Sequence, residues 1–183
     1  LNKVRLSLRD TYELISNDDL AFAWITDFPF YEYDEKSDSW DFGHNPFSHI
    51  VGWVESLKNK DFGEIETNQY DLALNGYEIL SWSIRNHDPK VMVAAFEKLG
   101  MDENEVKSRF GAMYEAFQYG CPPHGWFAIG FDRLMMILCD EENIRECYAF
   151  PKSGRAEDVM MWAPSFVDTA QLDELHIEVK DID

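Results

Sequence analysis

A chain of 183 residues, 45% hydrophobic and 15% aromatic, carries enough apolar surface for a packed core, which excludes a disordered chain. This length fits one domain, and we expect residues 1–183 to form a single one. The formal net charge of −19 excludes a nucleic-acid-binding module that works through a basic surface. No apolar stretch is long enough to span a membrane, and no signal peptide is visible. Three cysteines without CxxC spacing indicate a reducing compartment, so we expect a cytoplasmic protein.

The order of helices and strands follows from the spacing of apolar residues and from turn residues. Asn75-Gly76 predicts a hairpin, and Asp88-Pro89 opens a helix. Leu1 lies in an expected helix and is not Met, which suggests a removed upstream segment. The expected elements are helix 1–15, an aromatic strand 22–33 interrupted at Pro29, a hairpin across the turn 34–39, a short helix 51–57, strands 69–74 and 77–85, helices 88–99 and 102–119, strand 127–129, helix 132–139, a packed segment 144–150, helix 168–175 and a frayed end 178–183.

The predicted fold class is α+β, an antiparallel β-sheet flanked by helices. The sheet is expected to contain residues 22–33, 69–74, 77–85 and 127–129. The helix at 132–139 is expected to pack on it through Leu134, Ile137 and Leu138.

Polar side chains on the two hairpin strands form the first candidate site. On paired strands, Asp71, Glu78 and Arg85 can lie on one face of the sheet. There two carboxylates can hold Mg²⁺, and an arginine can bind a carboxylate ligand. A structural ion-pair cluster is the alternative. In the loop Gly43–Phe47, His44 is suited to binding a small polar ligand, and the alternative is an ordinary histidine at the surface or satisfied in the core.

A second candidate site follows the strand at 127–129. Gly130 ends that strand, and Arg133 lies in the first turn of the next helix, where a cation opposes the helix dipole. An arginine in that place suggests a phosphate ligand. The segments 150–153 and 163–165 indicate only loops.

Six collinear segments together resemble the C-terminal part of the catalytic domain of bacterial-type class II aspartyl-tRNA synthetases. They cover nearly the whole chain. The matches are Phe28–Tyr33 with DFPxxEYD, His44–Phe47 with HHPF or HNPF, Tyr70–Arg85 with YDxxxNGxE and SIR, Tyr119–Arg133 with YGxPPHGGxAxGxDR (motif 3), Asn143–Lys152 with IRDVIAFPK, and the closing Ala163–Ser165 with Leu172–Ile177.

The resemblance implies an aspartate–tRNA ligase, which uses ATP and Mg²⁺ to activate aspartate and transfers it to tRNA. The implied residue roles are ATP binding by Glu78, Gly130, Phe131, Asp132 and Arg133, metal binding by Asp71 and Glu78, aspartate binding by His44 and Arg85, and catalysis by Arg133, Arg85 and Glu78. Such chemistry depends on positioning and charge neutralisation.

The chain departs from the family in two ways. The anticodon-binding OB-fold, motif 1 and motif 2 are not in this sequence, so the missing N-terminal half is an expected partner and the isolated chain is expected to be inactive. Four tryptophans also stand where the family has glycine or a small residue, namely Trp53, Trp82 in the glycine triplet before SIR, Trp126 in PPHGG, and Trp162 before Ala-Pro-Ser.

Two hypotheses for these tryptophans stay open. In the first they are ordinary core residues of a diverged relative. In the second they fill the former nucleotide pocket, after natural loss of function or by design. In the second case we expect Trp82, Trp126 and Trp162 to meet in one cavity. The chain is then a non-catalytic binding or self-associating module, or an engineered scaffold with no cofactor of its own.

Overall fold

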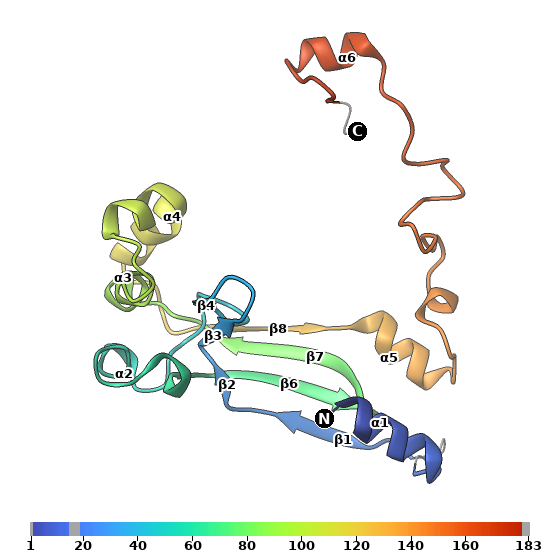
Figure 1. Ribbon diagram of the computed structural model, residues 1–183, viewed down its shortest axis with the longest axis horizontal. Helices are drawn as coiled ribbons and strands as arrows, with labels where there is room; N and C mark the ends of the chain where they lie inside the picture. Colours follow the sequence, from blue (N-terminus) through green and yellow to red (C-terminus); the bar gives the residue numbers. More distant parts are fainter. Residues whose placement is uncertain (1, 15–18, 181–183) are drawn as a thin grey trace. The chain divides into compact units, whose positions relative to one another are not determined.

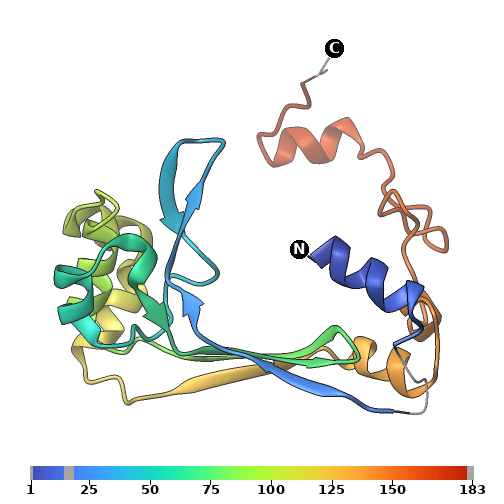
Figure 2. The same cartoon turned by 60° about the horizontal axis from the view of Figure 1, so that its bottom comes forward.

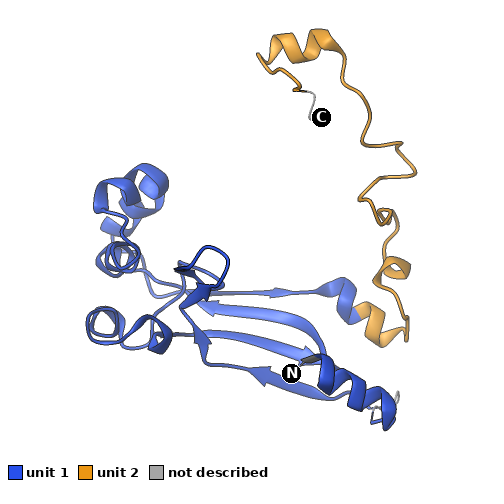
Figure 3. Cartoon of the chain, viewed as in Figure 1, with its two compact units in different colours: residues 1–134 blue, residues 135–183 orange. Residues whose placement is uncertain are grey.

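The computed structural model describes residues 2–14 and 19–180 (Figure 1). The chain divides into two compact units, Leu1–Leu134 and Met135–Asp183, coloured separately in Figure 3. The first unit contains the sheet and the second is mostly irregular. The single domain expected over residues 1–183 stays a prediction.

A four-stranded antiparallel sheet forms the first unit's centre and confirms the predicted α+β class. It contains β1 (Phe22–Ile25), β6 (Gln69–Leu74), β7 (Tyr77–Ile84) and β8 (Gly125–Ile129) in the order β1-β6-β7-β8. Asn75 and Gly76 join β6 to β7, with φ of 49° and 87°. Two successive left-handed residues fit the tight turn that the sequence predicts.

The strand expected over 22–33 is three strands, and only β1 belongs to the large sheet. Strand β2 (Phe28–Pro29) pairs with β5 (Glu66–Thr67), and β3 (Tyr31–Asp34) pairs with β4 (Ser39–Phe42). Asp27 adopts a left-handed backbone with φ of 60°, which interrupts the extended run after β1. Figure 2 shows the β3–β4 hairpin rising away from the large sheet.

Three helices gather beyond one end of the sheet (Figures 1 and 2), namely α2 (Trp53–Asn59), α3 (Pro89–Glu97) and α4 (Glu103–Gln118). Asp88 caps α3 by accepting a hydrogen bond from the Lys90 backbone N–H, with Pro89 in the first turn, as the sequence predicts. The short helix expected at 51–57 begins two residues later, at Trp53.

The hydrophobic core lies between these helices and the small strands. Phe30, Tyr31, Ile50, Ile65 and Val91 are almost fully buried there. The Tyr31 hydroxyl donates a 2.6 Å hydrogen bond to the Ala95 carbonyl, and burial raises the pKa of Tyr31. In contrast, every residue of β1 and β8 is exposed.

The face predicted for the helix at 132–139 is wrong at one of its three residues. In α5 (Phe131–Leu138) Leu134 and Ile137 are partly buried, but the fully buried residue is Met136, and Leu138 is 55% exposed. Two residues along a helix turn about 200°, so one face cannot bury both. The helix expected at 1–15 is present as α1 (Asn2–Thr11), with Val4 and Leu8 exposed, while Leu1 and Ile15 lie outside the described residues.

The second unit contains the 3-10 helix η2 (Ile144–Cys147) and α6 (Thr169–Glu174), which confirms the short helix predicted near 168–175. The first unit also has the 3-10 helix η1 (Phe62–Glu64). Residues 178–180 have no regular structure, and the rest of the expected frayed end, 181–183, lies outside the described residues. Among the described helices, none has the length and apolar character needed to cross a membrane.

Candidate functional site

The register of β6 and β7 brings the two predicted metal ligands to one face. Asp71 pairs with Ser81, and Ala73 pairs with Glu78, with a bulge between Leu72 and Ala73. Directly paired residues share a face of the sheet, and so do residues two apart on a strand. Asp71 and Glu78 therefore point the same way. Asp71 also accepts a 2.7 Å hydrogen bond from the Ser81 hydroxyl, which orients its carboxylate.

A groove of about 950 Å³ runs over this face. Both carboxylates line it, and so do Arg5 and Arg9 of α1. Arg9 also forms a 2.6 Å ion pair with Asp10 at the surface. The groove is large enough for a nucleotide-sized ligand, since ligand pockets typically enclose roughly 300–1,000 Å³.

The residues present fit Mg²⁺ that is bound together with phosphates. Magnesium ions in such sites use one or two carboxylates plus the oxygens of a substrate phosphate. Asp71 and Glu78 supply two carboxylates, while no group of three His, Cys, Asp or Glu side chains suited to a metal occurs within residues 2–14 and 19–180. This pair therefore suits a metal carried by ATP better than a permanent metal centre.

Arg133, which the motif 3 resemblance assigns to ATP binding, lies beside Glu78. Its Nη1 donates a 2.8 Å hydrogen bond to the Glu78 carbonyl and lies 3.9 Å from the Glu78 Oε1. Both side chains are about half exposed, so the pair is open to solvent and to a ligand. Gly130 helps to place the helix, because its N–H donates to the Ile79 carbonyl and its carbonyl accepts from the Leu134 N–H.

Two further residues with an implied ATP role begin α5. Phe131 is 64% exposed, and Asp132 is partly buried in the first turn of the helix. An acidic residue there favours the helix dipole, whereas Arg133 opposes it. Their expected contacts with ATP stay predictions.

Arg85 follows β7 and carries a partly buried guanidinium. Its Nη1 is buried and has no hydrogen-bond partner, and burial lowers the pKa of its guanidinium. Its Cζ lies 5.1 Å from the ring centre of Trp126, which pairs with Ser83 on the Asp71 face. An arginine remains charged in proteins, so this buried donor is suited to a carboxylate ligand.

The expected aspartate ligand His44 is exposed, and its ring lies 6.2 Å from that of Phe28. A different histidine pair was missed by the sequence reasoning. His49 and His87 both contact Trp53 with perpendicular rings, at 4.6 and 5.1 Å between ring centres. Burial, and secondly the nearby His87, lower the pKa of His49, and no spacing signal links residues so far apart.

The prediction that the tryptophans meet in one cavity is wrong for Trp82 and Trp126. Trp82 pairs with Phe127 and Trp126 pairs with Ser83, so the alternation of a strand sends them to opposite faces. Trp82 contacts Tyr70 and Phe127 on the face away from Asp71. Trp162 belongs to the second unit and is 85% exposed. That these four tryptophans fill a pocket stays a prediction.

Comparison with known proteins defines the class of protein. Residues 3–154 match the family model of the class II tRNA synthetases (D, K and N). The fold agrees, since the chain superposes on an aspartyl-tRNA synthetase from Entamoeba histolytica with a TM-score of 0.54, at 21% identity over 85% of this chain and 26% of that one. The asparaginyl-tRNA synthetase of the same organism gives 0.53, at 20% identity over 80% and 27%.

The chain therefore belongs to the class II tRNA synthetase family of D, K and N enzymes. Its similar relatives include the aspartate–tRNA(Asp/Asn) ligase of Rhodopseudomonas palustris (strain TIE-1), 51% identical over 96% of this chain. Another is the aspartate–tRNA(Asp/Asn) ligase of Chlorobium chlorochromatii (strain CaD3), 53% identical over 91% of this chain. The chain spans 30% and 27% of the length of these two relatives.

Proposed function

We propose that this chain supplies the ATP-, magnesium- and aspartate-binding residues of an aspartate–tRNA ligase and works together with the rest of such an enzyme. The observation that carries the proposal is Arg85, whose buried Nη1 lacks a partner on the face that also bears Asp71 and Glu78. A buried donor without a partner costs stability unless a ligand completes it. The aspartate–tRNA(Asp/Asn) ligases that match over most of this chain support the choice of aspartate.

Aspartate activation needs few groups from the protein beyond charges in fixed positions. A carboxylate oxygen of aspartate attacks the α-phosphorus of ATP, the bond to the β-phosphate oxygen breaks, and pyrophosphate leaves. The acyl group then moves to a tRNA 3′-terminal hydroxyl, with release of AMP. Magnesium, when bound, neutralises phosphate charge.

In this scheme each charged side chain has one task. Arg85 holds a carboxylate of aspartate by two parallel hydrogen bonds. Arg133, held by the Glu78 carbonyl at 2.8 Å, presents its remaining donors to the phosphates. Asp71 and Glu78 would hold Mg²⁺ when ATP brings it, and the Ser81 hydroxyl orients the Asp71 carboxylate. No general base is required, since the attacking carboxylate is already ionised.

The isolated chain should not perform this reaction. Charge stabilisation is the largest single contribution to most enzymatic rates, and of the motif arginines that contact phosphate only Arg133 belongs to this chain. We therefore expect aspartate-dependent pyrophosphate exchange only when the chain replaces the matching segment of a full-length relative.

The experiment is that chimera, built in the Rhodopseudomonas palustris ligase. Two versions are needed, with tryptophan and with glycine at positions 53, 82, 126 and 162. Exchange above the level of the isolated chain supports the proposal, and Arg133→Met should lower it about 10²- to 10³-fold. Arg109→Met, at an exposed side chain of α4, is the control and should leave it unchanged. Two folded chimeras without exchange would refute the proposal.

Self-association is a second candidate because of the exposed outer strands. Phe22 and Trp24 of β1, and Phe127 and Ile129 of β8, are each more than half exposed. Apolar surface of this kind favours association. Sedimentation velocity separates the candidates, since a self-associating module forms dimers at micromolar concentration without losing them when ATP and aspartate are added.

A further inference from the structure

Two tryptophans adopt a backbone conformation that suits glycine. Trp53 and Trp162 both have φ of 56°. Nine non-glycine residues have positive φ within residues 2–14 and 19–180, and five of them are Asp, Asn or His, the types that tolerate it. For a bulky side chain the same conformation is an outlier, which costs about 1–3 kcal/mol.

A second observation concerns the unsatisfied polar atoms. In the part of the chain that the structure describes, two buried side-chain nitrogen or oxygen atoms lack a partner, Arg85 Nη1 and His87 Nδ1. Trp126 lies over Arg85 at 5.1 Å, and Trp53 lies edge-on against His87 at 5.1 Å. Each indole therefore packs against a polar side chain. With glycine in place of the tryptophan, that side chain would gain room for water or a ligand.

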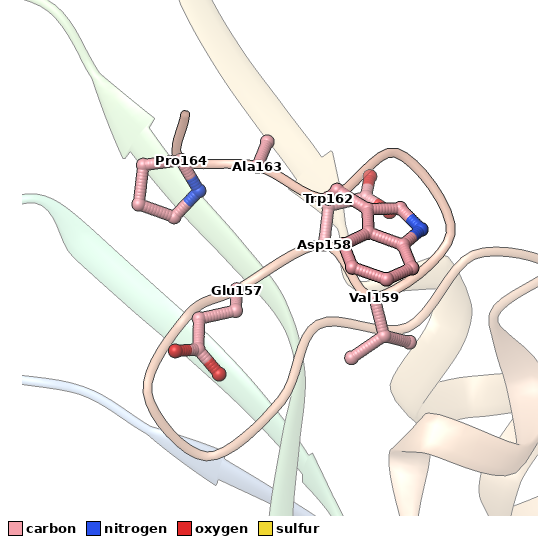
Figure 4. Close-up of a pocket in the computed structure, with 6 residues that line it drawn as sticks. All are labelled: Glu157, Asp158, Val159, Trp162, Ala163 and Pro164. Atoms are coloured by element: carbon pink, nitrogen blue, oxygen red, sulfur yellow. The ribbon is translucent and has the colours of Figure 1, made fainter. Parts of the chain in front are cut away.

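Trp162 shows the mismatch most simply. Asp158 and Ala163 exchange two backbone hydrogen bonds, of 2.8 and 3.1 Å, and so close a tight loop. Figure 4 shows Trp162 in this loop next to Ala163, and Val159 lines the same pocket. The side chain is 85% exposed, so burial of the indole contributes little to offset the left-handed backbone.

We propose that positions 53, 126 and 162 are glycine positions of this fold, and that the natural polypeptide carries glycine there and at position 82. Trp82 joins the group because it stands at the third glycine of the triplet before Ser-Ile-Arg. One cause explains four identical exchanges, namely the codon UGA, which different genetic codes read as stop, tryptophan or glycine. The source of this chain reads it as glycine.

Glycine at these positions changes the candidate site, and this part rests on the proposed function. Without the indole at position 126, the guanidinium of Arg85 is open on the face that carries Asp71. In the chimera, glycine at position 126 alone should therefore raise the apparent affinity for aspartate at least tenfold. An active tryptophan chimera with unchanged affinity would refute this access role, whereas two inactive chimeras would refute the proposed function.

The gene provides the first test. Codons 53, 82, 126 and 162 should be TGA, whereas the codons of Trp24 and Trp40, the two tryptophans outside this set, should be TGG. TGG at any of the four positions would overturn the proposal for that position. If all six tryptophan codons were TGA, the gene alone would not tell glycine from tryptophan, and mass spectrometry of the natural chain would decide between them.

The natural chain contains its own control. Trypsin cleaves after Lys36 and Lys58, and the peptide between them contains both position 40 and position 53. The proposal predicts one tryptophan, at position 40, and one glycine, at position 53. Tryptophan at both positions would overturn it.

Stability gives a test that depends on neither the codons nor the function. At positions 53 and 162, replacement by glycine should give a melting temperature about 2–4 °C higher than replacement by alanine, since both remove the indole and only glycine suits positive φ. At Trp24 and Trp40 the order should be reversed, because glycine weakens a strand. Alanine variants as stable as the glycine variants at both positions 53 and 162 would overturn the backbone argument.

Discussion

Arg85→Met tests whether the buried cation is kept for a ligand at the expense of stability. Methionine has a similar length and a flexible apolar chain, so it can fill the same space. The unpartnered Nη1 costs about 1–3 kcal/mol, which the change removes. The change also loses the contact with the Trp126 ring at 5.1 Å, worth about 0.5–1 kcal/mol. The difference between the two contributions is an expected rise of about 0–2.5 kcal/mol in the free energy of unfolding.

The assay is urea unfolding followed by tryptophan fluorescence, with Arg109→Met as the matched control. Arg109 is 57% exposed and forms a 2.6 Å pair with Glu105 one turn away, so its loss should cost about 0.3–0.5 kcal/mol. In the chimera the same Arg85 change should abolish aspartate-dependent exchange. A chain that Arg85→Met destabilises by more than about 1 kcal/mol would contradict the reasoning, because Nη1 must then have a partner within the protein.

Three other predictions follow from the same structure. Phe96 is 2% exposed and packs against three other phenylalanine rings, so Phe96→Ala should lower the free energy of unfolding in urea by about 3–5 kcal/mol. Phe131 is 64% exposed, so Phe131→Ala should lower it by less than about 1 kcal/mol. Equal losses would contradict the described core. The pKa of His49 is lowered in the folded chain, so the unfolded chain binds the extra proton first and stability should fall as pH drops below about 6.5. His49→Gln should flatten this part of the curve, and an unchanged slope would refute the assignment. Finally, the net charge of −19 should limit tRNA affinity of the isolated chain to about 10⁻⁴ M or weaker, and a sub-micromolar gel shift would contradict it.

Local patterns predicted the elements of the sheet well. Asn75-Gly76 fixes the β6–β7 turn, and that turn fixes the register that places Asp71 and Glu78 on one face. The sequence did not reveal the break of the first strand at Asp27. Its left-handed φ of 60° depends on how the following residues pair with β5, a strand some forty residues away.

The candidate site was only partly predictable for the same reason. The resemblance assigns both Arg133 and Glu78 to the ATP site, but their direct contact is seen only in the structure. Trp82 and Trp126 lie on opposite faces of the sheet because of the register between β7 and β8. That register could not be predicted from the sequence, since two helices separate the two strands. The contact of His49 and His87 through Trp53 also depends on tertiary packing.

The amino-acid dependence of pyrophosphate exchange tests the central claim most directly. The family includes D, K and N enzymes, so the chimera with glycine at the four positions should be assayed with aspartate, asparagine and lysine in parallel. The proposed function predicts exchange with aspartate and at least about 100-fold less with the other two, as a site built for a specific polar group discriminates strongly. Exchange with asparagine or lysine that equals or exceeds exchange with aspartate would contradict it.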